Sequence, residues 1–188
     1  EIDFCLPISL KEPSSISRPQ CSESELKILF VGSNFFANVD GIIWFVKSVM
    51  PRVNAKLTIV GKDIETELSS YASDKVRIIG FVDDLSEVYA QHQLVVVPIF
   101  LGAGMKVKIA EAFMHGKYVL TTEFAFKGYL KDNHIVSICN TPDEFINVIN
   151  TYPKENCYVP EAVEYFRSSY SHKSVLNKLR LFIKNENL

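Results

Sequence analysis

Short apolar runs that end at a glycine or a proline recur along the chain, and stretches with helical spacing of apolar residues fill the intervals between them. Runs of this length, with such boundaries, are typical of strands buried on both faces. The pattern predicts six strands, over Lys27–Val31, Lys56–Val60, Val76–Ile79, Leu94–Val97, Tyr118–Thr122 and Ile135–Ile138.

Apolar residues at intervals of three and four predict the helices. A broad apolar face follows Asn38, and Pro51 stops or bends that helix. A second helix is expected over Met105–Met114, and it is closed by His115 and Gly116 because glycine suits the left-handed position after a helix. The other predicted helices cover Ile64–Ala72, Asp84–Gln91 and most of the chain from Thr141 onward.

Strands that alternate with helices in this way predict an α/β fold, a doubly wound, Rossmann-like domain with a parallel sheet of about six strands. We assign this domain to residues 26–188, including the C-terminal helices. Residues 1–25 contain the stretch Pro13–Pro19 and are predicted to be a linker or the remnant of an interdomain segment. Ligands of such sheets bind at the carboxyl ends of strands near a switch point, so the loops after Val31, Ile79 and Val97 are candidates.

Composition narrows the class of protein. The 188 residues carry a formal net charge of −2, which gives no long-range attraction for nucleic acid. The four cysteines show no C-x-x-C spacing and the four histidines are scattered, so we expect no metal site, free thiols and a reducing cytoplasm. The chain has no apolar run of 18 residues and no signal peptide, and its start at Glu1 resembles that of an excised fragment.

The first candidate site is Gly32-Ser33-Asn34, directly after the first predicted strand. Gly32 lets the backbone approach a ligand, Ser33 and Asn34 offer hydrogen bonds, and the next helix presents free N–H groups to an anion. A plain turn between strand and helix is the alternative, because neither the dinucleotide fingerprint nor the P-loop pattern is present.

The second candidate site is the segment Gly102–Glu111, after the fourth predicted strand. The glycines of Gly102-Ala103-Gly104 permit a tight turn with exposed amides, which opens a helix near Met105. Lys108 and Glu111 are three residues apart and share one helix face. A cation and a carboxylate placed so would suit a sugar nucleotide, with the lysine on the diphosphate and the carboxylate on the ribose hydroxyls. An ordinary surface salt bridge is the alternative.

Two further segments carry weaker signals. Phe81 and Val82 follow the third predicted strand and could line a nucleobase pocket, or Phe81 could lie in the core with Asp83 or Asp84 as a helix cap. The last helix has apolar residues at helical spacing and basic residues on its other faces. The sequence leaves open whether this helix packs on its own domain, on a partner domain or on anionic lipid.

Taken together and in order, these segments resemble a known family. The runs GSNFFANVDGIIWFV, LTIVG, GFVDDLSEVY, VVVP, GAGMKVKIAEAFMHGK and VLTT are similar to the C-terminal, nucleotide-sugar-binding domain of retaining glycosyltransferases of family 4 (glycosyl transferases group 1), which have a GT-B fold. The resemblance covers about residues 26–130. It implies a polysaccharide- or glycolipid-building hexosyltransferase whose acceptor is held by a separate N-terminal domain.

The resemblance also implies roles for single residues. Glu111 matches the second glutamate of the family's Glu-x7-Glu motif and would hold the ribose, while Lys108 lies where some members place a cation near the diphosphate. Gly32, Ser33 and Asn34 would face the distal phosphate, and Phe81 and Val82 would flank the base. The amides of Gly102, Ala103, Gly104 and Met105 would lie against the sugar and phosphates.

Two departures from the family pattern accompany these matches. The first glutamate of Glu-x7-Glu falls at Ala103, and the places of a frequent arginine and lysine hold Ser33 and Asn38. Charge neutralisation would then fall on Lys106 and Lys108, as in the family subset with a G-x-G-x-x-x-K-x-x-E pattern.

The sequence therefore predicts a donor domain for glycosyl transfer, with a nucleoside-diphosphate sugar as substrate, Lys108 and Glu111 as the residues that carry the chemistry, and neither metal nor separate cofactor. We expect it in the cytoplasm, with peripheral contact at the inner membrane face as an open alternative. A degenerate or regulatory nucleotide-binding module also stays open. An epimerase-like Rossmann enzyme lacks its G-x-G-x-x-G here, and a response regulator lacks its clustered acids.

Overall fold

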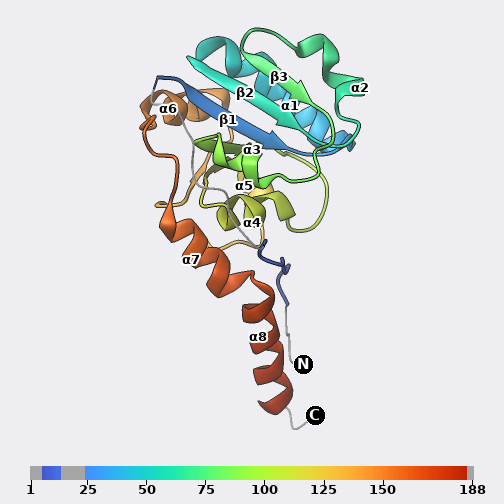
Figure 1. Ribbon diagram of the computed structural model, residues 1–188, viewed down its shortest axis with the longest axis vertical. Helices are drawn as coiled ribbons and strands as arrows, with labels where there is room; N and C mark the ends of the chain where they lie inside the picture. Colours follow the sequence, from blue (N-terminus) through green and yellow to red (C-terminus); the bar gives the residue numbers. More distant parts are fainter. Residues whose placement is uncertain (1–5, 14–23, 186–188) are drawn as a thin grey trace.

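A six-stranded parallel sheet forms the centre of the molecule in the computed structural model, which describes residues 6–13 and 24–185 (Figure 1). The strand order is β3-β2-β1-β4-β5-β6. Each predicted strand is present, with both ends within one residue of the expected position. The strands are β1 (Leu26–Val31), β2 (Ala55–Val60), β3 (Val76–Ile79), β4 (Leu94–Val97), β5 (Tyr118–Thr121) and β6 (Val136–Ile138).

Strand β4 confirms the apolar pattern, and strand β2 departs from it. All four residues of β4 are buried, as expected for a strand covered on both faces. In β2, Lys56 and Thr58 stay partly exposed, and Lys56 lies opposite Lys27 of β1. The middle of the sheet is therefore buried, and the sheet is partly polar and partly exposed towards the edge formed by β2 and β3.

The strand order places a switch point between β1 and β4. The chain moves outwards from β1 to β2 and β3, returns to the middle at β4, and then moves outwards in the opposite direction. Because crossovers between parallel strands are right-handed, the helices that follow β1 and β4 lie on opposite faces of the sheet. The carboxyl ends of β1 and β4 are left as the walls of a crevice, where ligands of such folds bind.

The helices are mostly those expected, with shifted ends. The helix after β1 starts at Phe36, before the predicted position, and the helix after β4 starts at Val107 instead of Met105. The predicted helix Ile64–Ala72 is split into a short α-helix and a 3-10 turn. The α-helices are α1 (Phe36–Ser48), α2 (Glu65–Leu68), α3 (Ser86–Ala90), α4 (Val107–Met114), α5 (Glu123–Phe126), α6 (Pro142–Thr151), α7 (Pro160–Ser169) and α8 (His172–Asn185).

Two of these helices show how local sequence sets their ends. Thr141 and Glu144 form a reciprocal capping box at the start of α6. Gly116 follows α4 with a φ of 65°, which confirms the predicted left-handed end, because a side chain at that conformation would be strained. The same glycine leaves room for Tyr158, which lies 2.4 Å from the place that a Cβ atom would occupy.

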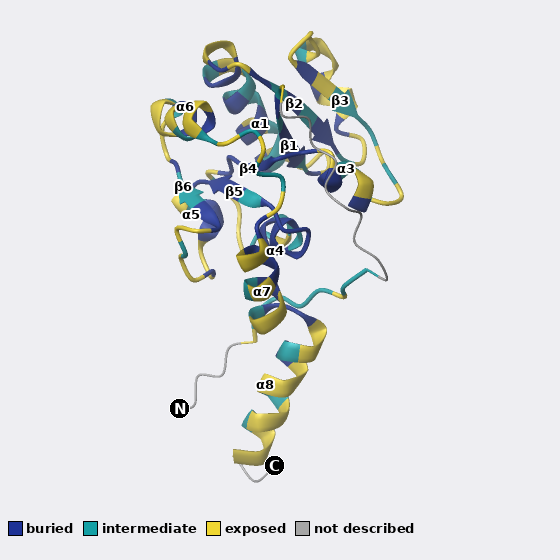
Figure 2. Ribbon diagram, turned by 60° about the vertical axis from the view of Figure 1, so that its left-hand side comes forward, coloured by how far each residue is buried: buried dark blue, intermediate teal, exposed yellow. Residues whose placement is uncertain are grey.

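The last helix leaves the body of the domain. α7 packs against α4, and α8 continues away from the sheet with most of its surface exposed (Figures 1 and 2). The segment 6–13 lies against the junction of α7 and α8, where Leu10 forms an isolated parallel β-bridge with Ser171. Apart from Pro13, the linker predicted over Pro13–Pro19 lies outside the described residues, as do Cys5 and Cys21.

The remaining sequence-level expectations concern thiols and membranes. Cys139 is buried and Cys157 is partly exposed, and both are free. Within residues 6–13 and 24–185, no helix has both the length and the apolar character needed to cross a membrane.

Candidate functional site

The side chain of Lys108, which is only partly exposed, lies at the carboxyl end of β1. The ammonium of Lys108 donates a hydrogen bond of 2.7 Å to the side-chain oxygen of Asn38, and Asn38 in turn donates one of 2.9 Å to the carbonyl of Ser33. The ammonium also lies 4.4 Å from the centroid of the Phe30 ring. A Cβ atom on Gly32 would stand 2.7 Å from this nitrogen, so a glycine after β1 is what leaves room for the lysine.

The surroundings of Lys108 leave its charge uncompensated. Burial lowers the pKa of its ammonium to about 7, although the nearby Glu111 acts in the opposite direction. Lys108 and Glu111 make no ion pair, so the surface salt bridge considered as the alternative is wrong. A partly buried cation that is held by an amide and has no ion-pair partner in the described part of the chain is suited to an anion that arrives from solution and pairs with it.

Glu111 belongs to a second polar group, one turn further along α4. Its carboxylate accepts a hydrogen bond of 3.0 Å from the Tyr89 hydroxyl of α3. The Tyr89 ring is stacked on the His115 ring, with centroids 4.4 Å apart and an interplanar angle of 7°. Burial raises the pKa of Glu111 and lowers that of His115 to about 4, so the imidazole is neutral near pH 7. The tyrosine thus fixes the glutamate and leaves one carboxylate oxygen for a ligand.

A hollow of about 520 Å³ opens beside this group, within the size range of small-molecule sites. Its walls come from the loop after β3, from one face of α4 and from the segment that precedes the sheet. Phe81 is 68% exposed and lies at this hollow, so its assignment to the core is wrong. The lining includes Lys11, Phe81, Val82, Asp84, Glu111 and His115.

The glycine-rich turn precedes Lys108 in the chain. Gly102 and Gly104 have φ values of 103° and 69°, a region in which other residues are strained. These conformations delay the start of α4 to Val107, because Lys106 is still extended. The Lys106 ammonium donates to the carbonyls of Ala103 and Gly104, at 2.9 and 2.8 Å, so it covers its own turn. The amides that open α4 have no side-chain cap.

The structure brings most of the sequence-predicted site residues to one edge of the sheet. Gly32 and Lys108 are in direct contact, and Phe81, Val82 and Glu111 share one hollow. Asn34 is different, because its side chain donates to Thr66 at 2.9 Å and is turned towards α2. Ser33 is exposed, and its carbonyl, rather than its hydroxyl, bonds with Asn38.

Sequence reasoning missed two residues of this arrangement. Asn38 was assigned only to the start of a helix, yet it holds Lys108 across 70 residues of sequence. Tyr89 was given no role within the predicted helix Asp84–Gln91, yet its hydroxyl orients Glu111. In each case a long-range hydrogen bond gives the residue its role, and such a bond leaves no periodic signal in a single sequence.

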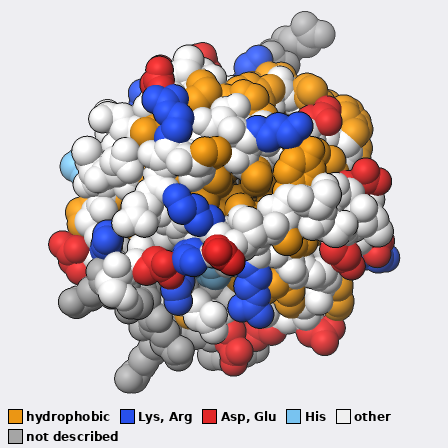
Figure 3. Space-filling view, turned by 90° about the horizontal axis from the view of Figure 1, so that it is seen from above, with side chains coloured by type: hydrophobic (Ala, Val, Ile, Leu, Met, Phe, Trp, Pro, Cys, Tyr) orange, Lys and Arg blue, Asp and Glu red, His pale blue; other side chains and the backbone are white. Residues whose placement is uncertain are grey.

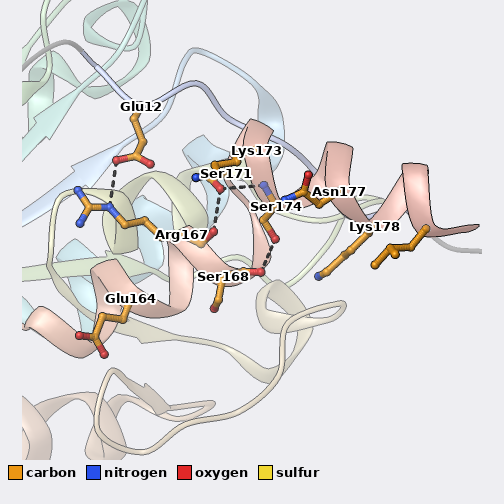
Figure 4. Close-up of a pocket in the computed structure, with 10 residues that line it drawn as sticks. Glu12, Glu164, Arg167, Ser168, Ser171, Lys173, Ser174, Asn177 and Lys178 are labelled. Carbon is orange, nitrogen blue, oxygen red and sulfur yellow. Dashed lines mark hydrogen bonds and ion pairs between the residues drawn. The ribbon is translucent and has the colours of Figure 1, made fainter.

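A larger hollow, of about 660 Å³, lies along the seam of α7 and α8 and shares Glu12 with the hollow beside Glu111 (Figure 4). Part of its polar lining is already paired. Arg167 pairs with Glu12 at 3.1 Å, and the Ser171 hydroxyl donates to the carbonyl of Arg167 at 2.7 Å. The Ser174 hydroxyl also bonds to the carbonyl of Ser168. These groups hold α7, α8 and the N-terminal segment together.

Positively and negatively charged side chains are mixed on the face of the molecule that lies opposite α8 (Figure 3). On the end of the molecule opposite α8, basic and acidic side chains are interspersed around hydrophobic ones (Figure 3). This face lacks the continuous basic stripe that nucleic-acid-binding proteins present.

Comparison with known proteins adds an independent line of evidence. The sequence model of the family "Glycosyl transferases group 1" matches residues 25–152. An uncharacterised 44.6 kDa protein in the cps region of Klebsiella pneumoniae is 27% identical over 173 residues, which are 81% of this chain and 44% of that protein. The chain thus spans less than half the length of this curated relative.

Solved structures share the fold at low sequence identity. A Staphylococcus aureus TarM mutant, in complex with fondaparinux, alpha-GlcNAc-glycerol and UDP, superposes with a TM-score of 0.70 at 16% identity over 95% of this chain and 39% of TarM. WaaG, a glycosyltransferase involved in lipopolysaccharide biosynthesis, gives a TM-score of 0.58 at 22% identity, over 81% of this chain and 43% of WaaG.

Proposed function

Because this chain belongs to the glycosyl transferases group 1 family, we propose that it is the domain that binds the nucleoside-diphosphate sugar in such an enzyme. The observation that carries the proposal is the placement of a partly buried lysine, Lys108, and a carboxylate, Glu111, one turn apart at the switch point of the sheet. The proposal also draws on TarM, a relative in fold whose structure contains UDP.

Each part of the donor has a matching group at this edge. The diphosphate would lie between Lys108 and the uncapped amides that open α4, where the helix dipole adds to the attraction. The ribose hydroxyls would donate to Glu111, which Tyr89 already orients. The base would enter the hollow beside Phe81 and Val82. Gly102-Ala103-Gly104-Met105 would face the sugar.

The proposed reaction is glycosyl transfer with departure of the nucleoside diphosphate, and we assign it to a retaining hexosyltransferase. Negative charge grows on the β-phosphate as the bond to the sugar breaks. A cation and amides that are already fixed at that place stabilise the transition state more than the ground state. Lys106, which covers the turn through two carbonyl contacts, would turn towards the phosphates when the donor binds. The proposal requires neither a metal nor a separate cofactor.

A second proposal has one specific observation in its favour. Ala103 is exposed on the turn and brings no carboxylate to the donor sugar, as the family's first glutamate would. A domain that binds nucleotide without transferring sugar would look the same at Lys108 and Glu111. The two proposals agree on nucleotide binding and differ only in whether the whole protein transfers sugar.

The whole protein extends the proposal beyond this chain. We expect an N-terminal domain that holds the acceptor, a glycan or glycolipid of surface polysaccharide synthesis, because the chain covers less than half of its relatives. The two free cysteines, Cys139 and Cys157, suit a reducing cytoplasm. Peripheral contact with the inner membrane face, through the full-length protein, stays a prediction.

A thermal shift panel tests donor binding on this chain directly. We expect one nucleoside diphosphate among UDP, GDP and ADP to stabilise it, while CMP and NAD do not. A ligand at about 100 times its Kd adds about 2.7 kcal/mol, which raises the Tm of a domain of this size by roughly 5–10 °C. Equal shifts with all ligands, or no shift with any, would contradict the proposal.

A further inference from the structure

An aromatic groove lies beside the glycine-rich turn, outside the hollow assigned to the base. Its volume is about 290 Å³, and α1, the segment after β4 and the loop before α6 form its walls. The Trp44 and Phe100 rings meet there nearly edge to face, with centroids 4.7 Å apart at 73°. The lining residues are Ala37, Asp40, Gly41, Trp44, Phe100, Leu101, Asn140, Thr141 and Pro142.

The aromatic corner is held in place by the packing of α1. A Cβ atom on Gly41 would stand 2.0 Å from the carbonyl oxygen of Pro98, so this glycine allows α1 to lie directly against the end of β4. That close approach brings Trp44 to Phe100. Phe145 of α6 supports the indole from another side, with centroids 5.8 Å apart. The rings are therefore preorganised, although Phe100 is 39% exposed and is only partly covered.

Unused polar groups surround these rings. Asp40 lies one turn before Trp44 on the same face of α1, and its exposed carboxylate has no partner in the described part of the chain. The indole N–H of Trp44 likewise has no hydrogen-bond partner among residues 6–13 and 24–185. Asn140 uses its side-chain oxygen to accept from the amide of Glu123, which leaves its NH₂ group to point a donor elsewhere.

We propose that this groove binds a neutral pyranose ring of the acceptor glycan. The electron-rich face of an aromatic ring attracts the weakly positive C–H face of a sugar, while Asp40 accepts from hydroxyls and Trp44 donates to them. A carboxylate at the rim disfavours acidic sugars through like-charge repulsion. This inference rests on the proposed function, because it makes the ligand a substrate of the same reaction.

The position of the groove explains why an acceptor, rather than the donor, would occupy it. Phe100 and Leu101 immediately precede the turn that would face the donor sugar, and a Cβ atom on Gly102 would lie 3.8 Å from that of Ala37 in the groove wall. A glycan seated on Trp44 would thus extend towards the reacting centre. Lys108 and Glu111 do not line the groove.

Trp44 makes the test direct, because it is the only tryptophan of the 188 residues. Its fluorescence is recorded during titration with maltotriose, cellotriose and chitotriose, with glucuronic acid as the like-charged control. We expect a saturable change with at least one neutral trisaccharide and a Kd of about 1 mM, as for weak binding of a small ligand. Glucuronic acid is expected to leave the emission unchanged.

Variants distinguish a specific sugar-binding site from nonspecific binding of sugars to exposed aromatic side chains. We expect Asp40→Asn and Phe100→Leu to weaken trisaccharide binding at least fivefold. Phe36→Leu is the matched control, because Phe36 is 57% exposed on the same helix but outside the groove, and it should bind as the unaltered chain does. No saturation with any trisaccharide by about 20 mM, twenty times that Kd, or equal binding by all variants, would overturn the proposal.

Two further measurements distinguish failure of the groove proposal from self-association of the chain and from failure of the donor-site proposal. Emission that changes on simple dilution would show that a second copy of the chain covers the groove, which also overturns the proposal. The nucleotide thermal shift is measured on the same variants. Retained stabilisation by nucleotide with no response to trisaccharides refutes the groove alone, and loss of both responses in the unaltered chain refutes the donor site as well.

Discussion

Two basic side chains of this molecule, Arg167 and Lys108, differ in what their charged groups contact. In the seam of α7 and α8, Arg167 is exposed and already paired with Glu12. At the switch point, Lys108 is only partly exposed, its ammonium donates a hydrogen bond to a neutral amide, and burial lowers its pKa to about 7. The seam has the larger hollow, but its arginine is already paired, whereas Lys108 has no ion-pair partner in the described part of the chain. An unpaired cation, rather than the volume of a hollow, therefore marks the place where a ligand belongs.

The largest expected effect comes from removing the cation of Lys108. Lys108→Met should weaken nucleoside diphosphate binding by about 100-fold or more, because a bound phosphate would lose its partner at a site largely removed from water. Isothermal titration measures the change. Arg167→Met, in the seam of α7 and α8, is the matched control, and it should leave the affinity unchanged; a comparable loss in both variants would contradict the difference between the two side chains.

The same pair of variants should differ in stability in the opposite sense. Without ligand, Lys108→Met is expected to raise the free energy of unfolding by about 1 kcal/mol, since a partly buried charge without an ion-pair partner in the described part of the chain is replaced by an apolar side chain of similar length. Arg167→Met should stay within about 0.5 kcal/mol, as is usual for exposed ion pairs. Urea unfolding at pH 6.5 provides both values, and a destabilised Lys108→Met would argue that the lysine is structural.

The protonation of Lys108 predicts how binding depends on pH. A bound diphosphate favours the ammonium form, so affinity is full below the free-state pKa of about 7 and falls as pH rises above it. If only the charged form binds, the Kd rises about 50-fold between pH 7 and 9. Titrations at several pH values should show this slope in the unaltered chain. They should show none in Lys108→Met, which has no proton to lose.

A smaller effect is expected at the carboxylate. Glu111→Gln keeps the shape but loses the charge that strengthens hydrogen bonds from ribose hydroxyls, so binding should weaken about 10-fold. The useful control is the ligand itself, because inorganic pyrophosphate has no ribose. Its affinity should be the same for both proteins, and an equal loss with pyrophosphate would show that the effect of Glu111 does not depend on the ribose.

The sequence predicted the sheet more completely than the site, and the reason is physical. Buried strands such as Leu94–Val97 need continuous apolar residues, and glycines such as Gly116 need particular backbone angles, so both leave local signals. The partnership of Lys108 with Asn38 depends on two loops that meet only in the folded chain. The same holds for Tyr89 and Glu111, and for the start of α4, which the φ values of the preceding turn postpone.

The most direct test of the account is a crystal structure of this chain with the nucleoside diphosphate that stabilises it most. The account predicts the β-phosphate within hydrogen-bond distance of the Lys108 ammonium, and both ribose hydroxyls on the Glu111 carboxylate. The base should lie beside Phe81 and Val82. A nucleotide bound in the seam of α7 and α8, or one at the switch point whose phosphates avoid Lys108, would contradict it.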